Sequence, residues 1–384
     1  MEIAAECEHR MEPVLVTPSQ PTPAHTLYLS NLDDQCLLRF SVEVLVEYYP
    51  LAGRLGPGDD GKLVVDCNAE GALFGEGFLP GLTADEFLRW SATPHESWRK
   101  LLRGGSKPQS LIGVPPLVVQ VTRLGCGGTI LCTAISHCLC DGIGAAQFLH
   151  AWARVASGGD PAATPSLFFG PLAPVSLTFT GAHAQRHRCV QWLEDCTSFE
   201  ALAAHVWRAW VRSLGPPSDL RVKLLFTVDI RRRVNPGLPE GYYGNGFVLA
   251  CAKSTAGQLA APSGEHHAAR LVRAAKEMID DDYVRSTVDL LELRRDAMPD
   301  LSASLVISAW TRMGLEDLDI GAGRPVHVGP LTSETYCLFL PVVDDPRGVT
   351  ALVSVPEAAA ERLEDGFLHG LELDDMHDVE NDEQ

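Results

Sequence analysis

The residues best suited to chemistry lie in one short stretch near the middle of the chain. His137 is followed, after three residues, by Asp141 and Gly142. An imidazole is the side chain best suited to accept a proton near neutral pH. The sequence before the histidine, LVVQVTRLGCGGTILCTAIS, predicts two strands joined by a glycine-rich turn, and GIGAAQFLHAWARVA after the aspartate predicts a helix. We therefore expect His137 at the end of a buried strand, where it could act as a general base in a cleft.

The same stretch permits other interpretations. A histidine at a strand end is often a core or capping residue, and the HxxxDG pattern alone does not exclude that role. Cys138 and Cys140 suggest a metal site with His137, but on a strand the side chains alternate between faces and cannot all meet one ion. A cysteine–histidine nucleophile is weakly supported, because nothing places either thiol in an electropositive setting. We therefore predict no metal at this stretch.

The bulk composition predicts a soluble protein of two domains. The chain has 384 residues, of which 46% are hydrophobic and 21% charged, and its formal net charge is -19. The acidic balance argues against nucleic acid as a partner. Eleven cysteines without a CxxC pair are typical of a reducing compartment. The acidic N-terminus and the absence of a long apolar run predict neither a secretory signal nor integral membrane association, so we expect a cytoplasmic protein.

Several elements must position the motif in the first half of the chain. Residues 11–26 are proline-rich and should be extended, and residues 27–35 predict a short strand and turn. Residues 41–49 fit either a helix or a strand, because their apolar spacing satisfies both. The segment AGRLGPGDDGKLVVDCN at 52–68 predicts a hairpin. Residues 156–190 are rich in proline and glycine, and we interpret them as the connection between two halves.

The second half alternates strands and helices. SFEALAAHVWRAWVRSL predicts a strong helix, because its apolar residues recur at helical spacing and Gly-Pro-Pro follows it. The expected order is a helix at 198–214, a strand at 220–230, a turn-rich loop at 231–246, a helical stretch at 266–294, a strand at 302–310, a β-pair at 334–343 and 348–355, a helix at 356–367 and an acidic solvated tail from 371.

Four other segments support a catalytic role for the His137 motif. YYPLAGRL at 48–55 precedes it; SFEALAAHVWRAW at 198–210, VDIRRRVNPGLPEGYYGN at 228–245 and DIGAGRPVHVGP at 319–330 follow it. Together, and in this order, the five segments resemble the plant BAHD acyltransferases, which carry an HxxxD motif near the middle and a DFGWG motif near the C-terminus. The resemblance covers nearly the whole chain. The chain is most similar to members that acylate alcohols with hydroxycinnamoyl or other acyl-CoA donors, including the ω-hydroxy fatty acid feruloyltransferase type.

The resemblance implies an α/β fold of two domains, chloramphenicol acetyltransferase-like, with mixed sheets flanked by helices and a solvent channel between the domains. We place the N-terminal domain at 1–165, a crossover connection at 166–196 and the C-terminal domain at 197–384. The implied activity is acyl-CoA-dependent O-acyl transfer to an alcohol, without a covalent intermediate. Acyl-CoA is then a cosubstrate and no cofactor is bound permanently. We expect a monomer.

The resemblance also implies roles for single residues. His137 takes the proton from the acceptor hydroxyl, a contribution of about 10²–10⁴ in rate for a general base. Asp141 forms a structural ion pair with an arginine, for which Arg231 is the expected partner and Arg233 the competitor. Gly142 has no side chain to block the channel.

The implied roles extend to a later segment. Ser308, in Ser-Ala-Trp where the family often has Thr-Ser-Trp, keeps a hydroxyl that could stabilise an oxyanion; an ordinary strand serine is an equal alternative. The late motif is matched by Asp319, Gly321 and Gly323. It is incomplete, because Ile320 and Ala322 stand where the family has Phe and Trp. That motif supports the C-terminal domain, so the departure affects stability more than mechanism.

The chain also departs from the family in length. Only CLLRFSVEVL lies between LSNLDDQ and VEYYPLAGRL, where a family member has a full strand and a longer helix. An alternative is therefore a shortened, catalytically impaired protein with a binding or accessory role. An N-acyltransferase that acts on an amine is a further alternative, because the same base serves either nucleophile. The surrounding motifs argue against chloramphenicol acetyltransferases and condensation domains, which share HxxxDG.

Overall fold

The protein is seen in a computed structural model, which contains no ligand. The structure describes residues 3, 7–8, 12–24, 26–28, 43–59, 61–90, 94–102, 112–156, 196–294, 300–320, 323–331 and 337–377. The connection expected at 166–196 therefore falls almost entirely outside the described residues, as does most of the shortened segment at 36–45. The proposed domain boundaries stay a prediction.

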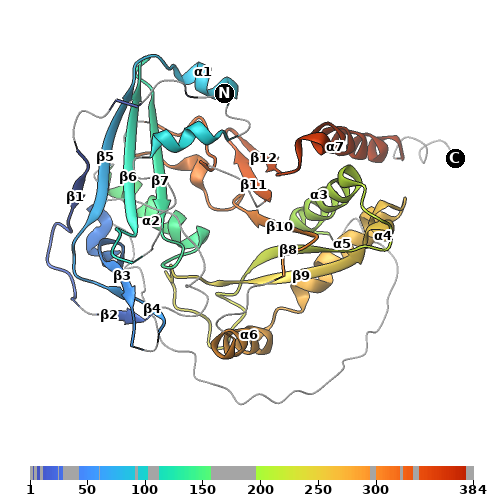
Figure 1. The fold of residues 1–384 in the computed structure, drawn as a ribbon, viewed down its shortest axis with the longest axis horizontal. Helices are drawn as coiled ribbons and strands as arrows, with labels where there is room; N and C mark the ends of the chain where they lie inside the picture. Colours follow the sequence, from blue (N-terminus) through green and yellow to red (C-terminus); the bar gives the residue numbers. More distant parts are fainter. Residues whose placement is uncertain are drawn as a thin grey trace.

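A four-stranded mixed sheet leads into the His137 motif (Figure 1). Its order is β1-β5-β6-β7, with β1 Val14–Val16, β5 Ala72–Leu79, β6 Leu117–Leu124 and β7 Thr129–Ile135. Strands β6 and β7 are antiparallel, whereas β5 runs parallel to β6. The predicted strand pair before His137 is thus confirmed. The predicted helix after Asp141 is also confirmed, as α2 Gly142–Ala156.

A small sheet lies beside this one in the first half. Strands β3 Arg54–Pro57 and β4 Leu63–Asp66 form the predicted hairpin, and β2 Thr26–Tyr28 pairs with β4. In the ambiguous segment at 41–49, the described residues 43–49 are neither an α-helix nor a strand. They form 3-10 turns, η1 Glu43–Val46 and the start of η2 Tyr49–Ala52. Leu45 and Leu51 of these turns are fully buried in one core with Phe148 of α2.

The third sheet belongs to the second half and has five strands. Its order is β12-β11-β10-β8-β9, with β8 Arg221–Asp229, β9 Phe247–Thr255, β10 Ser304–Ala309, β11 Cys337–Val342 and β12 Asp345–Leu352. Strand β10 is parallel to both β8 and β11, and the two edge strands are antiparallel to their neighbours. The predicted strands at 220–230 and 302–310 and the β-pair near the C-terminus are confirmed.

Helices cover one face of the five-stranded sheet. The helix predicted at 198–214 is confirmed as α3 Ser198–Leu214, which begins at a capping box between Thr197 and Glu200 and ends at Gly215 in the left-handed region. Its Trp207 is fully buried against the sheet in one core with residues of α5 Gly264–Glu277. The other helices are α1 Ala84–Trp90, α4 Ala256–Ala260, α6 Asp281–Leu293 and α7 Glu357–His377, with 3-10 turns η3 Glu96–Leu101 and η4 Leu315–Asp317.

Three expectations for the second half need correction. The helical stretch at 266–294 is two helices, because Asp280 is extended and caps α6 by accepting a hydrogen bond from the backbone of Tyr283. Strand β9 at 247–255 was not expected; in the first half, β5 was not expected either, because its glycines weaken its apolar pattern. Helix α7 continues to His377, so part of the expected acidic tail is helical.

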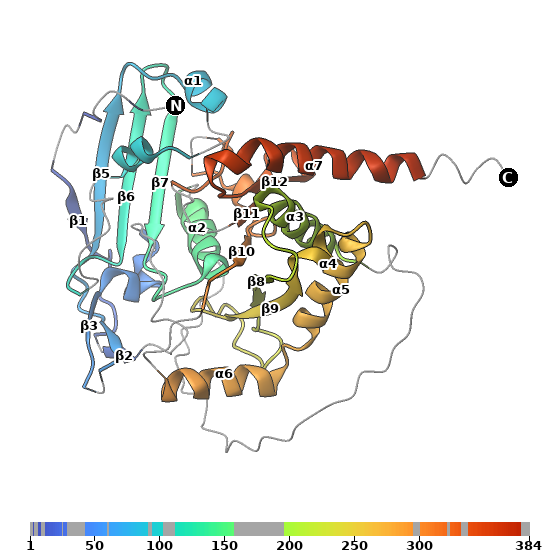
Figure 2. The same cartoon turned by 45° about the vertical axis from the view of Figure 1, so that its right-hand side comes forward.

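Helix α2 lies between the two large sheets, next to β7 on one side and β10 on the other (Figure 1, Figure 2). The element that follows the His137 motif therefore meets the second half of the chain directly. Within the described part of the chain, no helix is long and apolar enough to cross a membrane.

Candidate active site

His137 lies in a turn between β7 and α2. The turn starts where the Ser136 backbone N–H donates to the carbonyl of Pro116, 2.9 Å away. Cys138 and Cys140 are both buried in the hydrophobic core of the first half. The segment is a turn and not the strand end that was expected, and both thiols are packed into the core. Among the described residues, no three His, Cys, Asp or Glu side chains gather as metal ligands.

Asn245, from the loop before β9, binds His137 at two points. Its Nδ2 donates to the carbonyl oxygen of His137 over 2.6 Å, and its Oδ1 lies 3.0 Å from Nδ1 of the ring. A carbonyl oxygen can only accept, so the first bond fixes which end of the amide faces the ring. Oδ1 can also only accept, so Nδ1 must carry the proton. Nε2 is then left with its lone pair, as a general base requires.

The surroundings keep the imidazole neutral. Burial lowers the pKa of His137 below its ordinary value, and the charge of Asp141 offsets part of that effect. The ring meets Phe247 edge to face, with centroids 5.8 Å apart. A neutral imidazole with Nδ1 held by Asn245 is the form that can take a proton at neutral pH.

Asp141 is held by four hydrogen bonds. Nη1 of Arg231 donates to its Oδ2 over 2.9 Å, and Nη2 donates to its Oδ1 over 2.8 Å. The backbone N–H groups of Gly144 and Gly246 donate to the same carboxylate over 2.8 and 3.0 Å. Burial alone would lower the pKa of Arg231, but its hydrogen bonds to Asp141 outweigh that effect and the pKa is raised.

Arg231, and not Arg233, is the partner of Asp141. Arg233 instead donates to the backbone carbonyls of Lys276 and Ile279, over 2.9 and 2.8 Å. Arg231 also donates to the carbonyl of Gly244 over 2.9 Å, which ties the loop carrying Asn245 to the ion pair. The pair therefore joins the His137 turn to the loop that orients its ring.

The close approach of α2 to that loop depends on a glycine. A Cβ on Gly144 would overlap the carbonyl oxygen of Tyr243. The Tyr243 ring lies 4.7 Å from that of Tyr48, within the segment YYPLAGRL. This segment thus supports the Asn245 loop by packing, whereas its sequence alone gave it no role.

Ser308 and Phe247 lie on the same face of the five-stranded sheet. Ile307 aligns with Phe226, which aligns with Ala250, and all three face the core beneath α3. Ser308 follows Ile307, and Phe247 is three residues from Ala250. Since side chains alternate along a strand, both point to the opposite face. The Ser308 hydroxyl and the Phe247 ring, which contacts His137, therefore share one face, two strands apart.

The late motif forms a separate turn. The Gly323 backbone N–H donates to Oδ1 of Asp319 over 3.0 Å, and Arg324 pairs with Asp317. Gly321 and Ala322 lie outside the described residues. Both contacts stay within residues 317–324, in keeping with a supporting position.

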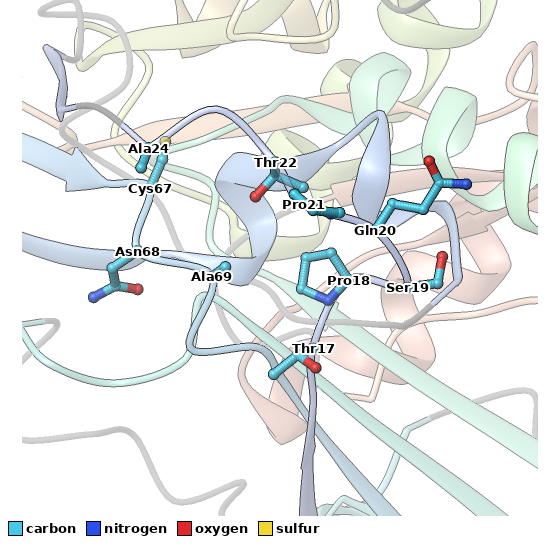
Figure 3. Close-up of a pocket in the computed structure, with 10 residues that line it drawn as sticks. All are labelled: Thr17, Pro18, Ser19, Gln20, Pro21, Thr22, Ala24, Cys67, Asn68 and Ala69. Atoms are coloured by element: carbon cyan, nitrogen blue, oxygen red, sulfur yellow. The ribbon is translucent and has the colours of Figure 1, made fainter.

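A pocket in the first half lies elsewhere. It is formed by the segment between β1 and β2 and by the turn after β4 (Figure 3). Its lining includes Gln20, Asn68 and Cys67, and none of the residues singled out for chemistry. The His137 turn instead brings together an imidazole whose Nδ1 is held by Asn245 and the buried ion pair of Asp141 with Arg231.

The chain is similar to known proteins over most of its length. A family model described as Transferase family matches residues 35–173 and 181–369. The chain is 33% identical to an omega-hydroxypalmitate O-feruloyl transferase of Arabidopsis thaliana, over 94% of this chain and 92% of that protein. It is 33% identical to a fatty alcohol:caffeoyl-CoA acyltransferase of the same plant, over 91% and 95%. A benzyl alcohol O-benzoyltransferase of Petunia hybrida is 31% identical, over 84% and 82%.

Solved structures share the fold. Vinorine synthase superposes with a TM-score of 0.71 at 21% identity, covering 93% of this chain and 96% of its own. An F. graminearum protein complexed with Coenzyme A and T-2 mycotoxin gives 0.69 at 17% identity, over 89% and 97%. The expected α/β architecture, with mixed sheets flanked by helices, is confirmed.

Proposed function

The chain belongs to the Transferase family of plant BAHD acyltransferases, and on that premise we propose that it transfers an acyl group from acyl-CoA to the hydroxyl of an alcohol, with His137 as the base. The observation that carries the proposal is the double contact of Asn245 with His137, which leaves Nε2 free to accept a proton. The relatives named above act on long-chain or aromatic alcohols. We infer a hydroxycinnamoyl or similar donor and a primary alcohol acceptor.

In this reaction a single atom, Nε2 of His137, acts first as a base and then as an acid. Nε2 of His137 takes the proton from the alcohol as its oxygen bonds to the thioester carbonyl carbon. The tetrahedral intermediate then collapses, the carbon–sulfur bond breaks, and the proton on Nε2 passes to the departing CoA sulfur. No enzyme nucleophile is needed, because both substrates are held together and react directly. Acyl-CoA is consumed and no resident cofactor takes part.

Ser308 is our candidate for the oxyanion donor. Its hydroxyl lies on the sheet face shared with Phe247, and a hydroxyl can donate to the negative oxygen of the intermediate. Asp141 and Arg231 take no part in proton transfer, because their charges are saturated by each other and by backbone groups. Their role is to hold the turn that carries His137.

The experiment uses the purified full chain with feruloyl-, caffeoyl- and benzoyl-CoA against ω-hydroxypalmitate, a fatty alcohol, benzyl alcohol and a primary amine. Ester or amide products are followed by mass spectrometry, with His266→Ala, at an exposed histidine of α5, as a matched control. Ester formation that depends on His137 supports the proposal. A folded protein that binds acyl-CoA without turnover supports instead the accessory role, which the aliphatic Ile320 in the late motif favours. Amide formation in place of ester identifies an N-acyltransferase.

We further propose that the protein acts in the cytoplasm as a monomer. Buried thiols such as those of Cys67, Cys132 and Cys337 suit a reducing compartment. Cell fractionation and the mass in solution test the two points separately.

A further inference from the structure

A second contact joins α2 to the other half, at the last residue of the His137 motif. A Cβ built on Gly142 would lie 2.6 Å from Cε and 3.3 Å from Sδ of Met313. Met313 belongs to the turn between β10 and η4, and its side chain therefore fills the space that a side chain at Gly142 would need. The space beside Gly142 is therefore occupied by the Met313 side chain and is not open.

The Met313 turn is fastened to the same helix. His150 Nε2 lies 3.0 Å from the carbonyl oxygen of Met313 and donates to it. Gly142, Ala146 and His150 are spaced by four residues, so they form one face of α2. Gly314 has φ +65°, and a Cβ there would also approach the His150 ring to 3.1 Å. The backbone of the turn is thus held in place while the Met313 side chain reaches Gly142.

This turn connects the two parts of the proposed reaction centre. It begins just after Ser308, at the end of β10. There the Trp310 backbone N–H donates to the carbonyl oxygen of Phe339 over 2.7 Å. Its Met313 side chain reaches Gly142, which stands five residues after His137. The Met313 side chain is half-buried, so part of its surface remains accessible. A flexible, polarizable thioether at such a place suits contact with an apolar group.

We propose that Met313 is a specificity-determining residue, which limits the bulk of the apolar group bound beside Gly142. This inference rests on the proposed acyl transfer. The group is either the acyl chain or the carbon skeleton of the acceptor alcohol, since both are apolar and both must approach His137. Shortening Met313 enlarges the site, and a methylene of space in an apolar pocket changes discrimination by about 10- to 200-fold.

The test compares Met313→Ala with wild type and with Met278→Ala, a matched control at a methionine that is 65% exposed. One arm varies the width of the acyl group with a fixed linear alcohol. The other arm varies the alcohol from linear to branched to aromatic with a fixed donor. We expect the ratio of kcat/KM for the widest over the narrowest substrate to rise at least about tenfold in one arm. Ratios unchanged in both arms, or changed equally by Met278→Ala, would overturn the proposal.

A thermal-melt cycle tests the contact without any substrate. Gly142→Ala forces the flexible end of the Met313 side chain to move, so it should lower Tm more in the wild-type background than in the Met313→Ala background. Equal losses in both backgrounds would contradict the contact. If the cycle shows coupling but no variant or wild type turns over any substrate, the proposed function fails and the contact stands.

Discussion

Asn245 holds both the ring and the backbone of His137. Its Oδ1 accepts a hydrogen bond from Nδ1 of the ring, and its Nδ2 donates one to the backbone carbonyl. The two residues are 108 positions apart and come from different halves of the chain. The base is therefore complete only when the two halves meet. Asn245 is a positioning residue in this account, because it acts on substrate only through His137.

Replacing Asn245 by alanine should free the ring to adopt the other tautomer. We expect kcat to fall about 100-fold, which is the lower part of the range for a general base, while acyl-CoA affinity changes little. Steady-state kinetics and a binding titration measure the two effects. Asn68→Ala, at an exposed asparagine bonded to Glu70, is the control. Equal losses in kcat and in acyl-CoA binding would point to collapse of the site and not to lost orientation.

The acidity of His137 gives a prediction for the pH profile. Its pKa is lowered by burial, so the imidazole becomes protonated only at a pH below its ordinary value of about 6.5. The base form is lost as pH falls through that lowered pKa. We expect kcat/KM to stay level from pH 8 to pH 6.5 and to decline only below that. A midpoint of the acid limb above 6.5 would show that the ring is not the buried base described here.

The Asp141–Arg231 pair should matter more for folding than for proton transfer. Asp141→Asn removes the buried counter-charge of Arg231 and leaves only the exposed Asp229, and breaking a buried pair costs about 3–5 kcal/mol. Denaturant unfolding of the full chain measures this loss. Asp229→Asn is a matched control, because Asp229 also touches Arg231, at 3.1 Å, but is 47% exposed and should cost about 1 kcal/mol or less. Similar losses for the two variants would contradict the structural role of Asp141.

Ser308→Ala should test the oxyanion proposal. Loss of one such donor lowers kcat by about 10²–10³, and KM should change little because the oxyanion exists only after attack. Ser304→Ala, on the same strand and bonded only locally to Ser302, is the control. A kcat within twofold of wild type would return Ser308 to the role of an ordinary strand residue.

The parts of the fold that could be predicted from sequence are those with local signals. Helix α3 matches its prediction at both ends because Thr197 and Glu200 form a capping box and Gly215 ends the helix. The β6–β7 pair and α2 also have strong local patterns. Strand β5 was missed because glycines at 75 and 77 interrupt its apolar pattern. Strand β9 was missed because it follows directly from a glycine-rich loop.

The site was predictable only in part, for the same reason. His137, Asp141 and Arg231 stand in segments that resemble a family, so their roles could be expected from that resemblance. Asn245 stands in one of those segments too, but its function depends on a ring that reaches it through the tertiary fold. Met313 has no signal at all, because its contact with Gly142 arises from the meeting of β10 and α2. Long-range contacts of this kind have no local pattern in the chain.

The central claim is that Nε2 of His137 is the base in acyl transfer, and His137→Ala tests it most directly. The measurement is the single-turnover rate of ester formation with bound acyl-CoA and saturating alcohol, compared with wild type and His266→Ala. We predict a rate lowered by about 10²–10⁴, with the melting profile and acyl-CoA binding retained and the His266→Ala rate unchanged. A His137→Ala protein that forms ester at the wild-type rate would contradict the account.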